Sequence, residues 1–334
     1  MTEQVSIGVI GSGAWGTALA IRHADAGRDV TLWARRPELA TEMQTSRANH
    51  AYLPDVVFPA ALKVTSELQA LDACDIWLLV TPAQSCRNMI RTLRDTGMKP
   101  RPLMLCCKGI ETGTGFLLAD IIRQEWPELP VGLMTGPTFA ADISRGLPSG
   151  MTISCDDTAL LNELQEKLNL KNLRLYQTSD MKGAECAGAL KNVMAIACGI
   201  VQGLQLGESA RAALVTRGLA EIARMAVHMG GERETLMGLC GIGDLMLTCS
   251  STKSRNFSLG LRLGQGEKME DILANRSDVT EGVTTTKAAY EIATRENIYM
   301  PITEAVYACL YASQNVQTAM NNLLNRPSSR EERY

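Results

Sequence analysis

The sequence predicts an α/β domain with a doubly wound parallel sheet, followed by a mainly helical second domain. The first observation is a series of short apolar runs that alternate with helical patterns, at 5–10, 29–34, 75–80, 103–107 and 131–134. The second is that this alternation stops near Thr178, after which long helical segments cover 180–206 and 208–229. We therefore expect one domain over 1–178 and another over 179–334.

Composition limits the class of protein. The chain has 334 residues, 46% of them hydrophobic and 21% charged, which is enough for a sizeable core. Its formal net charge is −3 and it has no long basic run, so nothing indicates nucleic acid or an anionic membrane as a partner. The N-terminus lacks the basic start and apolar core of a signal peptide, and we expect a cytoplasmic protein without stable membrane insertion.

Cysteine and histidine usage argues against disulfides and metals. The 10 cysteines contain no CxxC pair and lie mostly in apolar runs, so we expect buried thiols. The 3 histidines are scattered and show no metal-ligand spacing, so we expect no metal site. A histidine general base is also poorly supported, which directs attention to the lysines.

The run at 5–10 leads directly into Gly11-Ser12-Gly13-Ala14-Trp15-Gly16, and a helical pattern follows up to Gly27. A GxGxxG motif between a strand and a helix is typical of a Rossmann-type dinucleotide-binding domain. Gly11 permits the tight turn, Gly13 lets the backbone approach a pyrophosphate, and Gly16 lets the helix pack close to the strand. The N–H groups of the helix N-terminus then hold the anion. A tight turn that binds nothing is the alternative.

The end of the second strand bears on the choice of cofactor. NAD-preferring sites usually carry Asp or Glu there, to accept a hydrogen bond from the ribose 2′-hydroxyl. This chain instead has Arg35 and Arg36, followed by Pro37 and Glu38, which favour a helix start. The two arginines suit a 2′-phosphate and predict NADP(H) as the preferred or an equal cofactor beside NAD(H). Two merely solvated arginines are the alternative.

Ligands of such sheets bind beyond the carboxyl ends of the strands. The expected strand ends carry Thr81-Pro82, then Lys108-Gly109, then 136–140 with the sequence GPTFA. A lysine directly after a core strand and beside a glycine is a good candidate for holding an anionic substrate. Lys108 is therefore a candidate binding residue.

The helical segment 186–201 is apolar almost throughout, yet it carries Lys191 and Asn192 near its middle. A membrane span is excluded because the run is too short for one with a central charge. Lys191 either snorkels to the surface or faces a cleft, where desolvation lowers its pKa and allows proton exchange near neutral pH. The density of small residues in this helix brings neighbouring backbones close and leaves little room for snorkelling.

Two polar clusters follow in the second half. Asp244 stands in a glycine-rich apolar segment, and a helix that begins near Gly243 puts Asp244 and Thr248 on one face. A simple helix N-cap is the alternative role for Asp244. Next comes Ser254-Arg255-Asn256, in which the arginine's planar fork suits a phosphate. A surface arginine is the alternative.

Taken together, the motifs GSGAWG, CCKGIE, GPTFA, GALKN, GIGDLMLTC, KSRN and VTEG occur in this order along the chain. The sequence thereby resembles the bacterial NAD(P)-dependent glycerol-3-phosphate dehydrogenase family. The resemblance implies a Rossmann domain, a helical C-terminal domain and the reversible reduction of dihydroxyacetone phosphate to sn-glycerol 3-phosphate. It also implies a homodimer and a supply of glycerol backbones for phospholipids.

The resemblance assigns roles to residues of this chain. It implies that Lys191 is the proton donor and acceptor, with Lys108, Asp244 and Thr248 as the other catalytic residues. The implied cofactor contacts are Gly11, Ser12, Gly13, Ala14, Trp15, Gly16, Arg35, Arg36, Lys108, Ala140, Arg255, Val279 and Glu281. The implied substrate contacts are Lys108, Gly136, Thr138, Lys191, Asn192, Asp244, Ser254, Arg255 and Asn256. Ala14 departs from the serine of many relatives, so one side-chain contact to the cofactor is expected to be missing.

Two other functions stay open at this point. A dehydrogenase for β-hydroxyacids or 6-phosphogluconate pairs its helical lysine with an asparagine one turn later, whereas here Asn192 is adjacent and residue 195 is alanine. A non-enzymatic NADPH sensor would retain the fold without the chemistry, and the retained Lys108 and Lys191 argue against it.

Overall fold

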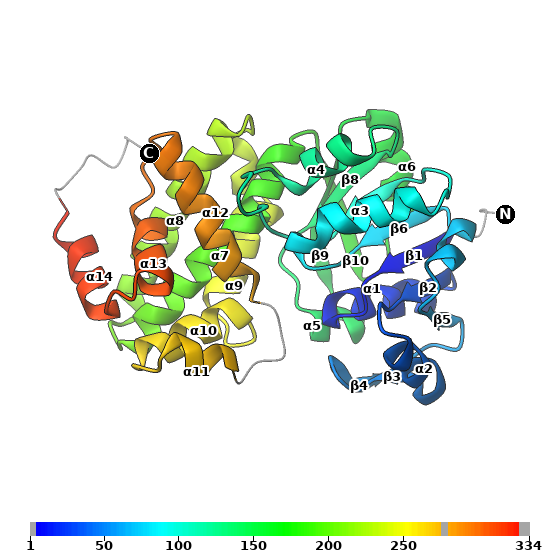
Figure 1. Ribbon diagram of the computed structural model, residues 1–334, viewed down its shortest axis with the longest axis horizontal. Coiled ribbons are helices and arrows are strands. Elements are labelled where there is room, and N and C mark those ends of the chain that lie inside the picture. The colour runs from blue at the N-terminus through cyan, green and yellow to red at the C-terminus, as the bar shows by residue number, and fades with distance from the viewer. Residues whose placement is uncertain (1–4, 275–279, 327–334) are drawn as a thin grey trace. The chain divides into compact units, whose positions relative to one another are not determined.

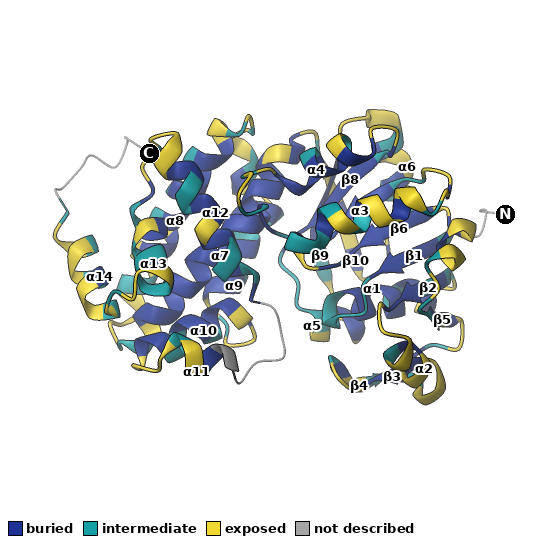
Figure 2. Ribbon diagram, viewed as in Figure 1, coloured by how far each residue is buried: buried dark blue, intermediate teal, exposed yellow. Residues whose placement is uncertain are grey.

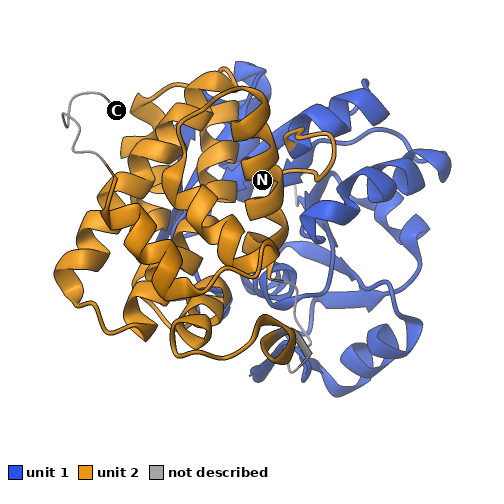
Figure 3. Ribbon diagram, turned by 60° about the vertical axis from the view of Figure 1, so that its left-hand side comes forward, with its two compact units in different colours: residues 1–107, 118–181 blue, residues 108–117, 182–334 orange. Residues whose placement is uncertain are grey.

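The computed structural model describes residues 5–274 and 280–326, which fold into two compact units. The first comprises Met1–Cys107 and Leu118–Met181, and the second comprises Lys108–Leu117 and Lys182–Tyr334 (Figure 3). The segment Lys108–Leu117 therefore belongs to the second unit, although it precedes residue 179, where the sequence analysis set the boundary.

The first unit is built on an 8-stranded sheet with the order β10-β9-β8-β7-β6-β1-β2-β5 (Figure 1). All neighbouring strands of this sheet run parallel except β8 and β9, which pair antiparallel. The elements are β1 (Ser6–Ile10), α1 (Ala14–Asp25), β2 (Asp29–Trp33), α2 (Pro37–Ser46), β3 (Ala48–Asn49), β4 (Leu53–Val57), β5 (Leu62–Thr65), η1 (Leu68–Ala73), β6 (Ile76–Leu79), η2 (Ala83–Ser85), α3 (Cys86–Asp95), β7 (Leu103–Leu105), α4 (Leu118–Glu125), β8 (Val131–Thr135), α5 (Ala140–Ser144), β9 (Ser149–Cys155), α6 (Thr158–Leu168) and β10 (Leu173–Thr178).

The central strands are buried on both faces, which is why they are apolar without a break. Ile7 and Val9 belong to the hydrophobic cluster that includes residues of α1, α2, α5 and α6. Trp77 alternates with these positions and is fully buried on the other face, 6.2 Å from the ring of Trp126. Helices therefore cover both faces of the sheet, and the predicted doubly wound architecture is confirmed.

The strand order reverses at β1, since β2 lies on one side of it and β6 on the other. Such a reversal separates the loops that leave the neighbouring strands and opens a crevice at their carboxyl ends. The glycine turn that follows Ile10 lies at this switch point. The fold thus brings the motif to the place where a parallel sheet binds its ligand.

Over its residues that the structure describes, the second unit is helical apart from an isolated bridge between Ile110 and Leu117. Its elements are α7 (Met181–Gly203), α8 (Glu208–His228), η3 (Glu234–Met237), the π-helix η4 (Leu239–Gly243), α9 (Asp244–Cys249), α10 (Arg255–Gly264), α11 (Met269–Ala274), α12 (Glu281–Arg295), α13 (Pro301–Tyr311) and α14 (Val316–Leu324). Both long helices predicted from the sequence are confirmed.

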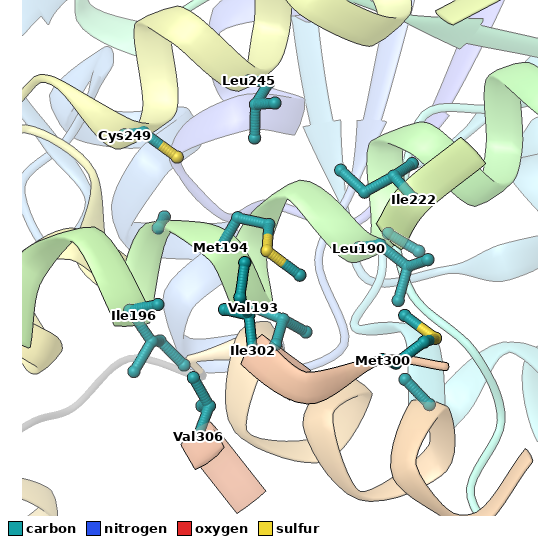
Figure 4. Close-up of a cluster of buried hydrophobic side chains, with 14 of the residues drawn as sticks. Leu190, Val193, Met194, Ile196, Ile222, Leu245, Cys249, Met300, Ile302 and Val306 are labelled. Carbon is teal, nitrogen blue, oxygen red and sulfur yellow. The ribbon is translucent and has the colours of Figure 1, made fainter. Parts of the chain in front are cut away.

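Helix α7 is the core of this unit. By length and composition alone this helix of 23 residues could cross a membrane, so the exclusion by length was wrong. Its whole apolar window is nevertheless buried inside the protein (Figure 2). Its side chains Leu190, Val193, Met194 and Ile196 pack in one cluster with residues of α8, α9 and α13 (Figure 4). The helix is apolar all round because it is surrounded by other helices.

Glycines let α10 pack directly on α7. A Cβ on Gly199 would lie 2.1 Å from the carbonyl oxygen of Phe257, and one on Gly260 would lie 2.0 Å from that of Ile196. Both separations are far below van der Waals contact, so each position excludes any side chain. The sequence-based expectation of close backbone packing around this helix is confirmed, and it fixes the start of α10 relative to the middle of α7.

Candidate active site

The glycine turn of the first unit fits a pyrophosphate. Gly11 has a φ of +119°, and a Cβ there would lie 2.9 Å from the carbonyl oxygen of Val80. A Cβ on Gly16 would lie 2.0 Å from the carbonyl oxygen of Gly11, so helix and turn are in direct contact. At Gly13, by contrast, a Cβ would meet nothing within 4 Å. The turn is therefore closed beneath Gly11 and Gly16 and open above Gly13, as an approaching phosphate requires.

Helix α1 offers its N-terminus to such an anion. Its N-cap is Gly13, which makes no side-chain cap, and its first turn carries no acidic residue. The N–H groups of the first turn are thus available to a ligand, and the helix dipole favours a negative charge there. Ala14 is the first residue of the helix and Trp15 follows it half-buried.

A residue that the sequence analysis missed supports this turn. Asn49, in β3, is fully buried, and its amide donates hydrogen bonds to the carbonyl oxygen of Ser12 at 2.9 Å and to Oγ1 of Thr17 at 2.8 Å. Asn49 lies 37 residues after Ser12, and no local pattern marks it. Its partners show that the turn is anchored from outside the motif.

Arg35 and Arg36 are exposed at the end of β2, and Arg36 is the N-cap of α2, with Pro37 next in the helix. Glu38 lies in the first turn of α2, as the sequence predicts. Neither arginine forms an ion pair with any part of the chain that the structure describes. Their guanidinium groups can therefore reach a dissolved anion.

The remaining first-unit candidates follow β8. A Cβ on Gly136 would lie 2.9 Å from Cα of Met151 on β9, so this position requires glycine. Thr138 and Ala140 are half-buried, and Ala140 is the first residue of α5. These residues follow the carboxyl end of β8 along the chain, where ligand contacts are expected.

The second unit brings together the four residues expected to be catalytic. Lys191, from α7, donates hydrogen bonds to Oδ1 of Asp244 and, at 3.0 Å, to Oγ1 of Thr248. Lys108 donates to the other carboxylate oxygen, Oδ2 of Asp244, at 2.7 Å. One carboxylate therefore bridges two ammonium groups, and we call these four residues the lysine–aspartate cluster.

The cluster is withdrawn from water. The side chain of Asp244 is 0% exposed, that of Lys191 is 8% exposed and that of Lys108 is 16% exposed. Burial lowers the pKa of Lys191 to about 7; the charge of Asp244 opposes this change and that of Lys108 adds to it. Lys191 can therefore both give and accept a proton near neutral pH.

These contacts decide between the alternatives left open by the sequence. Lys191 does not snorkel, because its ammonium is buried among hydrogen-bond partners. Asp244 is not an N-cap, because Gly243 occupies that position and no side-chain cap forms. Asp244 and Thr248 do share a face of α9, with their oxygens 3.3 Å apart. Thr248 accepts a hydrogen bond from the ammonium of Lys191, whereas Asn192, the next residue of α7, is buried and forms no hydrogen bond with that group.

The start of α10 holds three expected ligand contacts. Ser254 is the N-cap, and its hydroxyl oxygen accepts a hydrogen bond from the backbone N–H of Phe257, so this side chain is used by the helix itself. Arg255 is exposed at the first position of the helix, whereas Asn256 is 8% exposed. The Oδ1 atom of Asn256 accepts from the backbone N–H of Gly282 at 2.9 Å.

Two expected cofactor contacts remain, Glu281 and Val279. Glu281 is the first residue of that helix and is half-buried. Val279 lies outside the residues that the structure describes. Within the described chain, no group of 3 or more His, Cys, Asp or Glu side chains is arranged to hold a metal ion. All 10 cysteines are free thiols, and all except Cys309 are buried, so the expectation of buried thiols holds for the others.

Comparison with known proteins matches both halves of the chain. Residues 6–161 match the family described as NAD-dependent glycerol-3-phosphate dehydrogenase N-terminus, and residues 180–321 match the family described as NAD-dependent glycerol-3-phosphate dehydrogenase C-terminus. The chain is 46% identical to glycerol-3-phosphate dehydrogenase [NAD(P)+] from Maricaulis maris, over 99% of each chain.

Solved structures agree with this match. Glycerol-3-phosphate dehydrogenase from Coxiella burnetii superposes with a TM-score of 0.92 at 35% identity, covering 97% of this chain and 99% of the other. The yeast Saccharomyces cerevisiae enzyme of the same name superposes with a TM-score of 0.81 at 25% identity, covering 97% of this chain and all of the other.

Proposed function

Because the chain belongs to the NAD-dependent glycerol-3-phosphate dehydrogenase family, we propose that it reduces dihydroxyacetone phosphate reversibly to sn-glycerol 3-phosphate with NAD(P)H. It is an oxidoreductase that uses NAD or NADP. The observation that carries the proposal is the buried carboxylate of Asp244, which holds the ammonium groups of Lys191 and Lys108 in one place.

The residues of the cluster supply the proton chemistry of a carbonyl reduction. When bound, NAD(P)H supplies the hydride that C2 of the substrate receives. The ammonium of Lys191 gives its proton to the oxygen on C2, a transfer that contributes about 10²–10⁴ to the rate. Lys108 adds positive charge, which stabilises the developing alkoxide in a site withdrawn from water. In the reverse reaction, neutral Lys191 accepts the proton of the hydroxyl group.

Asp244 and Thr248 keep Lys191 in position for this transfer. The carboxylate offsets part of the cost of burying two cations, and without it both ammonium groups would repel each other in a desolvated site. The hydroxyl of Thr248, at 3.0 Å from Nζ of Lys191, restricts the direction in which the ammonium points. Two N–H groups of Lys191 donate to Asp244 and Thr248, and the third can donate a hydrogen bond to a substrate oxygen.

Arginines of the chain are proposed to bind the phosphate groups of substrate and cofactor, in separate roles. Arg255 binds the substrate phosphate, because its planar fork bonds two oxygens at once. Arg36 and Arg35 bind the 2′-phosphate of NADP(H), so NADPH serves at least as well as NADH. The glycine turn at 11–16 holds the pyrophosphate of either cofactor.

The family resemblance also supports a proposal about oligomeric state, location and metabolic use of the product. We propose a cytoplasmic homodimer that feeds sn-glycerol 3-phosphate into glycerophospholipid synthesis, without nucleic-acid partners or stable membrane insertion. A turnover assay tests the proposal most directly: oxidation of NADPH and of NADH is followed with dihydroxyacetone phosphate and with unphosphorylated dihydroxyacetone. We expect rapid turnover only with the phosphorylated substrate. Absence of that turnover would refute the proposed function.

A further inference from the structure

Three helices of the second unit meet at Gly282. The backbone N–H of this residue, in the first turn of α12, donates to Oδ1 of Asn256 on α10 at 2.9 Å. A Cβ on Gly282 would lie 2.4 Å from that same oxygen and 2.9 Å from the carbonyl oxygen of Asn192 on α7. Side chains essentially never make contacts this short, so α12 reaches this point only with glycine. We call Asn192, Asn256 and Gly282 the helix junction.

The junction adjoins residues that the proposed mechanism uses. Asn192 directly follows Lys191, Asn256 directly follows Arg255, and Gly282 is the neighbour of Glu281. A shift of the junction would therefore displace Lys191, Arg255 and Glu281, which are expected to contact substrate or cofactor. Small displacements of this kind lower catalytic rates strongly, because reacting groups need close alignment.

The hydrogen bond from Gly282 also determines which way the amide of Asn256 points. A backbone N–H can only donate, so the amide atom that faces it must be the carbonyl oxygen Oδ1 and not the NH₂ group. The NH₂ group of Asn256 consequently faces away from α12. Its two N–H donors are then left for the anion that Arg255, the preceding residue, is proposed to bind. A flipped amide would instead direct an acceptor oxygen toward that anion and repel it.

We propose that Gly282 is a positioning residue: its N–H holds the amide of Asn256 so that the NH₂ group faces the phosphate of the substrate. The role rests on the proposed function for the identity of the substrate. Glycine is required at 282 because any Cβ would press on the oxygen that its own N–H must reach.

Gly282→Ala is the variant that tests this role. We expect KM for dihydroxyacetone phosphate to rise about tenfold or more, the loss typical of a hydrogen bond to a charged group. KM for NADPH and turnover of unphosphorylated dihydroxyacetone should change much less. Gly218→Ala is the matched control, because its Cβ would also meet a residue of α7, the flexible side chain of Met194 at 2.7 Å, but lies away from Asn256.

Two further variants separate orientation from packing. Asn256→Asp retains an acceptor for the N–H of Gly282 but exchanges NH₂ for oxygen, so KM for the phosphorylated substrate should rise while turnover of unphosphorylated dihydroxyacetone changes much less. In an Asn256→Ala background no amide remains to be oriented, so Gly282→Ala should add little to the loss. Equal losses on both substrates, or fully additive losses in the double variant, would overturn the inference.

Binding of inorganic phosphate separates this inference from the proposed function. Calorimetric titration of the wild type and of Gly282→Ala needs no turnover. We expect weaker phosphate binding in the variant. A wild type that binds phosphate but does not reduce dihydroxyacetone phosphate would count against the function alone. A wild type that turns over normally, with phosphate affinity and KM unchanged in Gly282→Ala, would count against the positioning role alone.

Discussion

Replacing Lys191 by methionine removes the expected proton donor while leaving the buried carboxylate paired. Methionine has a similar length and no charge, so it fills the same space. Asp244 keeps Lys108 at 2.7 Å and Thr248 at 3.3 Å, so no buried anion is left without a partner. We therefore expect the free energy of unfolding to change by no more than about 1 kcal/mol.

The effect on catalysis should be far larger than the effect on stability. Loss of a general acid costs about 10²–10⁴ in rate, which corresponds to about 3–5 kcal/mol of activation free energy. Because the lost proton transfer belongs to the transition state, Lys191→Met should lower kcat and leave binding of NADPH nearly intact. The glycine turn that is proposed to hold the cofactor is not altered by the substitution.

Steady-state kinetics with saturating NADPH, combined with fluorescence titration of NADPH, measure these two quantities separately. Lys287→Met is a suitable control, because Lys287 is a half-exposed lysine on α12 that lies 4.0 Å from Glu291 and takes no part in the cluster. Near-normal turnover in Lys191→Met would refute the catalytic role. A large fall in stability with an equal loss of NADPH binding would show that Lys191 maintains the fold instead.

The other predictions use the same cluster and the expected phosphate contacts. Asp244→Asn leaves the ammonium groups of Lys108 and Lys191 without their carboxylate, so chemical denaturation should show a loss of about 3–5 kcal/mol, larger than that of Lys191→Met. The pKa of Lys191 is about 7 in the folded protein, so kcat/KM for reduction should fall as pH rises through about 7, while kcat/KM for oxidation should rise. If both kcat/KM values changed with pH in the same direction, the proton-transfer role would be contradicted. The pKa of a lysine in the unfolded chain is about 10.4, so between about pH 7 and that value Lys191 binds more protons in the unfolded state than in the folded state. The contribution of Lys191 to the free energy of unfolding should therefore increase as pH rises from about 7 to about 10.4. Arg36→Asp should raise the ratio of kcat/KM with NADH to kcat/KM with NADPH. A wild type that does not oxidise NADPH would contradict the role of this arginine. Arg255→Ala should lower kcat/KM for dihydroxyacetone phosphate by about 10² or more and Arg255→Lys by less, whereas an equal fractional loss on unphosphorylated dihydroxyacetone would mean that Arg255 holds the cofactor or the fold.

The parts of this protein that could be predicted from its sequence are those fixed by local patterns. The first strand, the glycine turn and α1 follow from adjacent residues, and so does the common face of Asp244 and Thr248, which are four residues apart on one helix. The burial of helix α7 was also predictable, because a long segment of small apolar residues is stable only where other parts of the protein cover it.

The parts that could not be predicted depend on pairing between distant segments. Strands β9 and β10 lie on the outer side of β8, and β9 runs antiparallel to β8, although its sequence carries no sign of direction. The segment Lys108–Leu117 follows β7 after only Cys106 and Cys107, yet it belongs to the second unit, where Ile110 and Leu117 join the core around α7. A sequence pattern indicates that a segment is apolar, but it does not indicate which core receives it.

The same distinction applies within the candidate site. A lysine in an apolar helix predicts a buried cation, but the partner of Lys191 lies 53 residues away, and Lys108 lies 136 residues from the carboxylate that both share. Resemblance to a family names such residues without stating what each one contacts. Gly282 is the clearest example of a requirement that the sequence does not reveal. Within the motif VTEG, nothing distinguishes it from any other glycine at the start of a helix. Its requirement follows only from two oxygens on other helices, both within 3 Å of the place where its Cβ would stand. In the proposed role, a substitution at Gly282 acts through Asn256, so its effect should be judged by which substrate loses affinity and not by stability alone.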